Sequence, residues 1–133
     1  MDAQAKYVLH FFFESGGGCL WPGNDAAYQA FELGPYDLLD PCPIPLSAGI
    51  LQRCRQMAEW HDTSLNSDYP PDPGPWRKAE CDRFNAAVTE LLADIHRELG
   101  PAFEVIDRQA QLVEDPELDA YLADPKGFRR KQP

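Results

Sequence analysis

Two clusters of prolines divide this chain into segments with different structural options. Proline lacks a backbone N–H and clashes with the preceding helical turn, so neither cluster can lie inside a helix or a central strand. The cluster within residues 34–45 predicts an extended connector, and the cluster within residues 62–76 predicts a long, stiff loop. Loops of this length without secondary structure of their own are uncommon and often functional. The prolines are Pro35, Pro41, Pro43 and Pro45 in the first cluster and Pro70, Pro71, Pro73 and Pro75 in the second.

Apolar periodicity predicts regular elements on either side of these clusters. Residues 6–14 alternate on two apolar faces, which is typical of an interior strand. Ser47 can cap a helix with an apolar stripe, and Gly100-Pro101 ends a longer one. Residues 19–25, after the Gly16-Gly17-Gly18 run, are predicted to form a turn. The predicted strands cover residues 6–14 and 102–108, and the predicted helices cover residues 25–32, about 47–61, about 77–99 and 115–122.

The order of these elements predicts an α/β or α+β fold, a single small domain with a short β-sheet covered by two main α-helices. The 133 residues suit one domain. Two strands make a poor sheet, so we expect a third from residues 29–38 or 109–114, or strand pairing between subunits of a homodimer. We expect the globular domain to span residues 1–125 and the basic residues 126–133 to form a mobile C-terminal tail.

The charge balance restricts the class of partner. The formal net charge is -10, and four of the 12 basic residues lie in the last eight positions, at Lys126, Arg129, Arg130 and Lys131. An acidic body repels phosphate backbones, which excludes nucleic acid as the main ligand and favours a basic partner or simple solubility. No segment approaches the roughly 18 apolar residues that span a bilayer, and the first residues lack an export signal. We therefore expect a cytoplasmic protein with no membrane contact.

The cysteines and histidines form no recognisable metal or catalytic motif. Cys19, Cys42, Cys54 and Cys81 are 23, 12 and 27 residues apart, without the short pairs that structural zinc sites use. We expect four reduced thiols, mostly buried, with no metal and no cofactor. The oxygen-bearing residues of the loop, which include Asn66, do not have the spacing of a calcium loop.

Large aromatic and acidic residues gather in the predicted loops. Aromatic anchors with an acidic rim are the composition of a surface that captures a basic protein. The alternative is that the tryptophans close the core beneath the loops while the acids are merely solvated. The candidate partner-binding residues are Trp21, Asp25, Asp62, Asp68, Tyr69, Asp72 and Trp76.

Two segments and their surroundings resemble a known class of bacterial proteins. The segments are GGGCLWPGND at residues 16–25 and DTSLNSDYPPDPGPW at residues 62–76, followed by a long helix and GPAFEV at residues 100–105. Together with the size and acidity, they resemble small immunity proteins of polymorphic or contact-dependent toxin systems, over about residues 7–107. The resemblance implies a cytoplasmic protein, not an enzyme, that binds and neutralises a cognate toxin with a basic domain, commonly a nuclease.

A competing hypothesis is a small enzyme or ligand-binding domain. Strand ends followed by glycine-rich loops are common ligand sites in α/β folds. That hypothesis places His10, Cys19 and His61 around one cleft at the end of the first strand. A homodimer whose strands pair across the interface is a further alternative.

Overall fold

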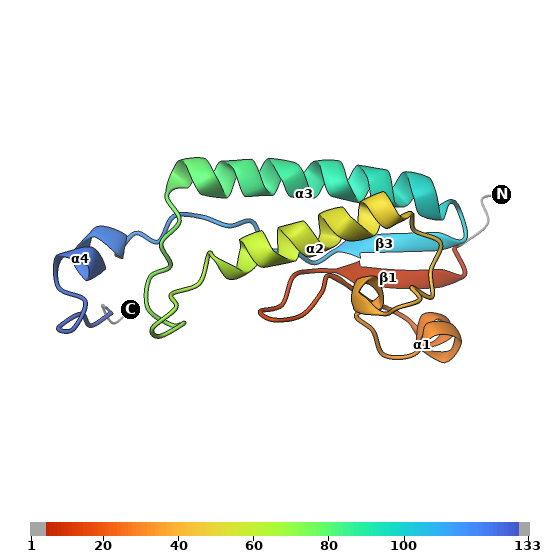
Figure 1. Ribbon diagram of the computed structural model, residues 1–133, viewed down its shortest axis with the longest axis horizontal. Helices are drawn as coiled ribbons and strands as arrows, with labels where there is room; N and C mark the ends of the chain where they lie inside the picture. The colour runs from red at the N-terminus through yellow and green to blue at the C-terminus, as the bar shows by residue number, and fades with distance from the viewer. Residues whose placement is uncertain (1–4, 131–133) are drawn as a thin grey trace.

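The computed structural model describes residues 5–130 and has an α+β fold with one three-stranded sheet (Figure 1). Strand β1 (Tyr7–Phe11) lies in the centre, antiparallel to β2 (Leu20–Pro22) and parallel to β3 (Phe103–Asp107). The central place of β1 confirms the predicted interior strand. Its Leu9 and Phe11 are fully buried on the core face, whereas Val8 and His10 on the other face are only half-buried.

The third strand differs from both sequence predictions. Residues 29–38 contain the end of a helix and a 3-10 turn, residues 109–114 form no regular element, and residues 20–22 pair with β1 instead of forming a turn. The glycine run reverses the chain, so that the N–H of Phe12 donates to the carbonyl of Cys19 at 3.0 Å and the N–H of Gly23 donates to that of Val8 at 2.7 Å. Pairing with β1 therefore makes a strand from three residues that are too few to show an alternating pattern.

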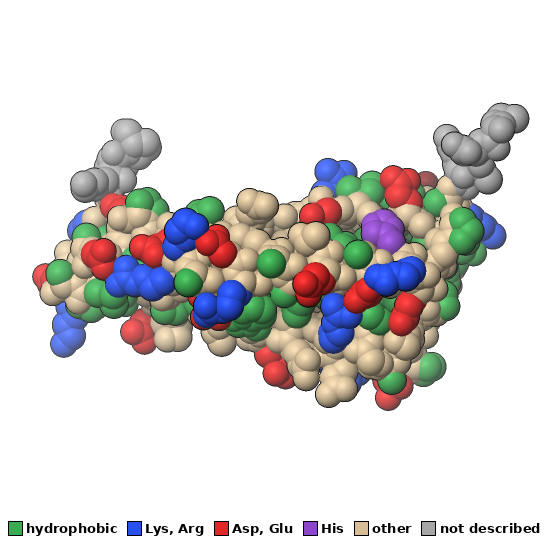
Figure 2. Space-filling view, turned by 90° about the horizontal axis from the view of Figure 1, so that it is seen from above, with side chains coloured by type: hydrophobic (Ala, Val, Ile, Leu, Met, Phe, Trp, Pro, Cys, Tyr) green, Lys and Arg blue, Asp and Glu red, His purple; other side chains and the backbone are tan. Residues whose placement is uncertain are grey.

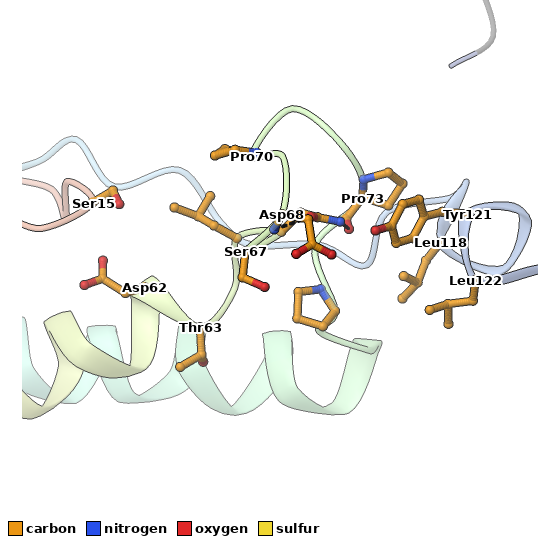
Figure 3. Close-up of a pocket in the computed structure, with 13 residues that line it drawn as sticks. Ser15, Asp62, Thr63, Ser67, Asp68, Pro70, Pro73, Leu118, Tyr121 and Leu122 are labelled. Carbon is orange, nitrogen blue, oxygen red and sulfur yellow. Dashed lines mark hydrogen bonds between the residues drawn. The ribbon is translucent and has the colours of Figure 1, made fainter. Parts of the chain in front are cut away.

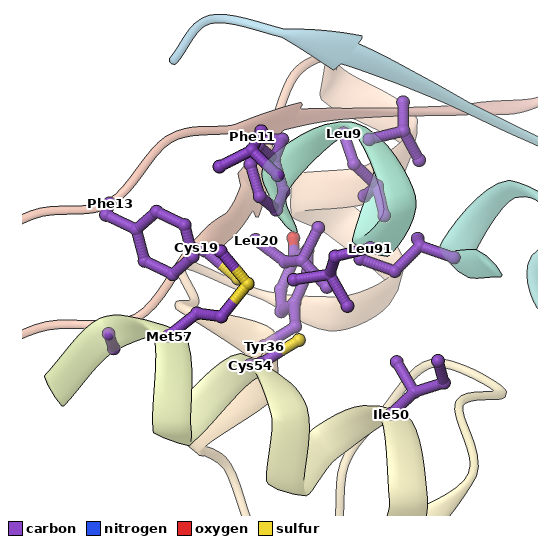
Figure 4. Packing of buried hydrophobic residues seen from close by; sticks show 14 of the residues in the cluster. Leu9, Phe11, Phe13, Cys19, Leu20, Tyr36, Ile50, Cys54, Met57 and Leu91 are labelled. Carbon is purple, nitrogen blue, oxygen red and sulfur yellow. The ribbon is translucent and has the colours of Figure 1, made fainter. Parts of the chain in front are cut away.

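Two long helices lie across one face of this sheet, as the sequence predicted (Figure 1). Helix α2 (Ala48–Asp62) begins where the Ser47 hydroxyl accepts from the N–H of Ile50, and helix α3 (Lys78–Leu99) ends at Gly100. Their apolar stripes meet the sheet in a continuous core of buried residues (Figure 4). Burial of apolar area on this scale is the main force that holds the layers together.

Three shorter elements complete the chain. Helix α1 (Asp25–Phe31) is capped by Asn24, and the 3-10 helix η1 (Tyr36–Leu38) lies in the proline-containing connector. Helix α4 (Leu118–Ala123) lies beyond the amino end of α3, beside the proline-rich loop, which we define as residues 62–76 (Figure 1). The loop and α1 are at opposite ends of the molecule. None of the helices among residues 5–130 combines the length and the apolarity needed to cross a membrane.

The face that carries α3 is a mixture of both charges (Figure 2). Lys78 pairs with Asp82, Arg83 with Glu80, and both Arg53 and Arg97 with Asp94. Four cations on this side of the molecule thus have carboxylate partners.

Candidate functional site

The proline-rich loop and α4 enclose a groove of about 720 Å³ (Figure 3). Asp62, Thr63 and Asp68 contribute polar groups from the end of α2 and the loop, and Leu118, Tyr121 and Leu122 contribute an apolar wall from α4. The remaining lining residues are Ser15, Leu65, Asn66, Ser67, Pro70, Pro73 and Pro75. We call this surface the acidic groove. Concave sites that combine apolar walls with a few polar groups are typical of binding surfaces.

The groove is stiff because the loop is tied across its own base. Asn66 is 7% exposed, and its side-chain nitrogen donates to the carbonyl of Pro73 at 3.0 Å. The Asn66 Oδ1 accepts from the N–H groups of Asp68 and Tyr69, both at 2.9 Å, which forms a tight local turn. One side chain thereby fixes both arms of the loop and the direction of the Asp68 backbone.

Two further contacts close the loop. The indole N–H of Trp76 donates to the Thr63 hydroxyl at 3.0 Å. Gly74 lies so close to the carbonyl oxygen of Ser64 that a Cβ at this position would overlap it. Only glycine permits this approach of the two arms, so the loop is an ordered part of the fold with a low ordering cost on binding.

The acids of the loop point to two different surfaces. Asp62 and Asp68 line the acidic groove, are exposed, and form no ion pair with any of residues 5–130. Asp62 instead accepts a hydrogen bond from the N–H of Gly16 at 3.3 Å, which compensates for its unfavourable place at the carboxyl end of α2. Asp72 and Tyr69 line a second hollow, together with Lys126, Pro125, Pro71, Phe128, Arg129 and Arg130. Two exposed carboxylates without an ion pair among the described residues therefore face the acidic groove.

Arg130 connects α4, the segment before it and the loop. Its guanidinium contacts Asp115 at 2.7 Å and Glu117 at 2.9 Å, and its Nε donates to the carbonyl of Pro71 at 2.9 Å. The guanidinium beside Asp115 lowers the pKa of that carboxyl group. Arg130 of the expected tail thus contacts the loop, and residues 131–133 lie outside the described part of the chain.

The structure does not bring all seven predicted partner-binding residues together. Trp21 lies on the half-buried face of the sheet, where its ring stacks on Phe12 at 5.3 Å, and it does not line the acidic groove. Asp25 is exposed in α1, at the opposite end of the molecule (Figure 1). Trp76 is 8% exposed and packs on Trp60 and Phe84, so it belongs to the core and offers almost no surface to a partner.

The residues of the competing enzyme hypothesis do not share a cleft. His10 lies on the half-buried face of the sheet, whereas Cys19 is completely buried on the core side. His61 packs against Phe13 and Phe84, and burial lowers the pKa of its imidazole although the neighbouring Asp62 raises it. None of the three lines the acidic groove or the second hollow.

Sequence reasoning missed the residues that shape the groove. It considered Asn66 only as a cation ligand, although a polar residue at the start of a proline-rich loop is a typical turn former. Leu118, Tyr121 and Leu122 recur at helical spacing, which indicates a helix but not the surface that it faces. No local signal links Arg130 to Asp115 across 15 positions.

Comparison with known proteins gives one family model that matches this chain. The family model described as Serratia CdiI immunity protein-like matches residues 20–108, which is about two thirds of the chain. A search of curated proteins found no match. The matched region begins at β2 and ends after β3, so it includes α2, α3 and the whole proline-rich loop.

Proposed function

The chain belongs to the Serratia CdiI immunity protein-like family, and from this membership we propose that it binds a cognate toxin through the acidic groove and thereby neutralises it. The presence of this groove is the one observation on which we base the choice of the toxin-binding surface. Its apolar wall can bury a partner side chain, and its two unpaired carboxylates can accept hydrogen bonds from a basic one.

The electrostatics favour a toxin with a basic surface. The net charge of the chain is -10, while most cations on the α3 face are already paired with carboxylates. Asp62 and Asp68 are therefore positioned to attract a Lys or Arg side chain and to accelerate association. A nuclease is one toxin class that carries such a surface, because its active site must bind phosphate.

The protein acts by binding and not by turnover in this proposal. The residues of the competing enzyme hypothesis lie in separate places, and immunity of this kind needs only a complex that blocks the toxin. We place this action in the cytoplasm, where a toxin of the nuclease class finds its substrate.

The first experiment tests whether a complex forms. The tagged chain is mixed with the toxin domain encoded by the neighbouring reading frame, in a catalytically inactive form, and analysed by size-exclusion chromatography. A stoichiometric complex and protection of cells that express the active toxin are expected. Absence of both would overturn the proposed function.

The second experiment tests the surface. Asp62→Asn combined with Asp68→Asn removes two charges from the groove, and Glu59→Gln combined with Glu90→Gln removes two from exposed positions on α2 and α3. We expect the first pair of substitutions to slow association several-fold at low salt and the second pair to change it little. Dissolved salt screens charges that lie far from the bound partner, so charges next to it have the larger effect on the association rate. Equal effects from both pairs, or association that does not depend on salt, would contradict the role of the groove.

A further inference from the structure

Three potential metal-ligating side chains meet in the core, away from the acidic groove. One sulfur or oxygen atom from each of Cys19, Asp37 and Cys54 lies within 4.8 Å of the other two, and all three residues are buried. Cys19 precedes β2, Asp37 lies in η1 and Cys54 lies on α2, so the cluster joins three elements. Cys19 and Cys54 face the same core layer between the sheet and α2 (Figure 4).

Asp37 has an unusual environment for a carboxyl group. It is completely buried, and within residues 5–130 no Lys, Arg or His contacts it. Its Oδ1 accepts from the N–H groups of Cys19 at 3.0 Å and Leu20 at 3.1 Å, its Oδ2 accepts from the Cys19 N–H at 3.2 Å, and the carboxyl group also interacts with the Cys19 thiol. These hydrogen bonds leave room on the carboxylate for a cation, since an ionised carboxyl group has about four acceptor sites.

The backbone is shaped around this carboxyl group. A Cβ on Gly18 would lie 2.6 Å from both Asp37 oxygens, so a residue with a side chain would displace the carboxyl group from its position. A buried polar group that is enclosed this closely normally has full compensation. Hydrogen bonds satisfy the Asp37 oxygens, but residues 5–130 supply no opposite charge, which a cation between Asp37 and the two thiols would provide.

We propose that Cys19, Asp37 and Cys54 bind a Zn²⁺ ion that joins β2, η1 and α2. Zinc takes thiolate and carboxylate ligands at about 2.3 and 2.1 Å in a tetrahedral arrangement, which places its ligand atoms roughly 3.5–3.8 Å apart. The separations of at most 4.8 Å must therefore contract by up to about 1 Å when the ion binds. On binding, each thiol loses its proton to water and becomes a thiolate ligand.

A further cysteine, Cys42, lies near the cluster but is not one of the three side chains whose ligand atoms meet. Cys42 is half-buried in the connector after η1, and its thiol pKa is raised by burial and, to a smaller extent, by the nearby charges of Asp37 and Cys54. Three protein ligands leave one position of a tetrahedral zinc ion open, which water or a rearrangement of the Cys42 connector would fill. Because the cluster is buried, the ion enters during folding.

The test uses the full chain with its affinity tag removed, produced with zinc in the medium and purified without chelator. The zinc content of the purified chain is measured by inductively coupled plasma mass spectrometry. Separately, the denatured chain is refolded with one equivalent of Co²⁺, whose charge-transfer absorption reports thiolate ligands. We expect about one zinc ion per chain and a thiolate-to-cobalt band.

The variants are Cys19→Ala and Cys54→Ala, with Cys81→Ala as the matched control, because Cys81 is a buried free thiol on α3 outside the cluster. The cluster variants should lose the ion and the cobalt band, and the control should keep both. If a cluster variant does not fold, the cobalt spectrum of the wild-type chain still shows whether thiolates bind the metal. Absence of zinc and of the cobalt band in the wild-type chain, equal loss in all three variants, or a Cys19–Cys54 disulfide in the purified protein would overturn the proposal.

Discussion

Asn66 and Pro73 join the two arms of the proline-rich loop through a side-chain hydrogen bond of 3.0 Å that is almost fully shielded from water. The same Asn66 side chain accepts from two backbone N–H groups on the other side of its amide. The shape of the acidic groove thus depends on a residue that presents almost no surface of its own. Preorganisation by such a residue lowers the entropy that a partner must overcome.

Asn66→Ala should loosen the loop and weaken toxin binding. Loss of three hydrogen bonds, one of them buried and two part-buried, should lower the free energy of unfolding by about 1–3 kcal/mol. Dissociation of the toxin should become several-fold faster. Both are measured by chemical denaturation and by surface binding kinetics.

Asn85→Ala is the matched control for this prediction. Asn85 also makes paired hydrogen bonds to backbone, with the N–H and the carbonyl of Leu112, but it lies on α3 outside the acidic groove. The Asn85→Ala substitution should reduce stability about as much as Asn66→Ala does and leave the rate of toxin dissociation unchanged. Equal acceleration of dissociation in both variants would show that general destabilisation is the cause.

Trp76→Ala and Tyr69→Ala should behave in opposite ways, although the sequence predicts both as partner-binding aromatics. Trp76 is 8% exposed between Trp60 and Phe84, so its removal should cost about 3–5 kcal/mol of stability. Tyr69 is 58% exposed, and its removal should change stability by less than about 0.5 kcal/mol. Thermal melting of the two variants is the measurement, and similar melting temperatures would contradict the structure.

His61 should make the protein less stable as the pH falls below about 6.5. Burial lowers the pKa of the folded imidazole, so below 6.5 the unfolded chain binds a proton more readily than the folded one. Stability is therefore complete above the unfolded pKa and is lost as the pH falls toward the folded pKa. Chemical denaturation between pH 5 and pH 8 measures this slope.

His61→Phe should reduce that slope and raise stability. Nδ1 of His61 is buried without a hydrogen-bond partner, and the ring already packs against Phe13 and Phe84. An apolar ring should remove a penalty of about 1 kcal/mol. His96→Gln, at an exposed position on α3, should retain the slope; if it removes the slope instead, the assignment to His61 fails.

Arg130→Ala should release the C-terminal segment from the loop while leaving the core intact. The guanidinium holds Asp115, Glu117 and the Pro71 carbonyl together, but it lies outside the apolar core. Amide hydrogen exchange should accelerate in α4 and residues 124–130 with little change in α3. Arg129→Ala removes the same charge from a residue whose guanidinium, within residues 5–130, bonds only the neighbouring Phe128 carbonyl. It should leave exchange unaltered, and faster exchange in this variant too would indicate a general charge effect.

The helices were predictable to within a few residues because their signals are local. Ser47 caps α2 as expected, and Gly100 ends α3 with a positive φ that glycine adopts freely. Strand β2 was not predictable, because its hydrogen bonds go to β1 and to the Asp37 side chain, which is 17 or 18 positions away. A three-residue strand has too short a pattern to be distinguished from a turn.

The candidate site was predictable only in part, for the same reason. The proline-rich loop and its acids are visible in the sequence, and Tyr69 and Trp76 both stand next to prolines. Their different burial is decided by Trp60 and Phe84, which come from α2 and α3. The apolar wall of the groove comes from α4, some 50 positions along the chain from the loop.

The sequence by itself determined the order of the helices, the stiffness of the loop and the excess of negative charge. Periodicity, capping and proline chemistry act between residues a few positions apart, so they can be recognised without coordinates. The tertiary structure alone decided which acids face the acidic groove, that Trp76 joins the core, and that Cys19, Asp37 and Cys54 meet. Burial and close contact depend on distance in space, and packing brings together residues that the chain keeps far apart.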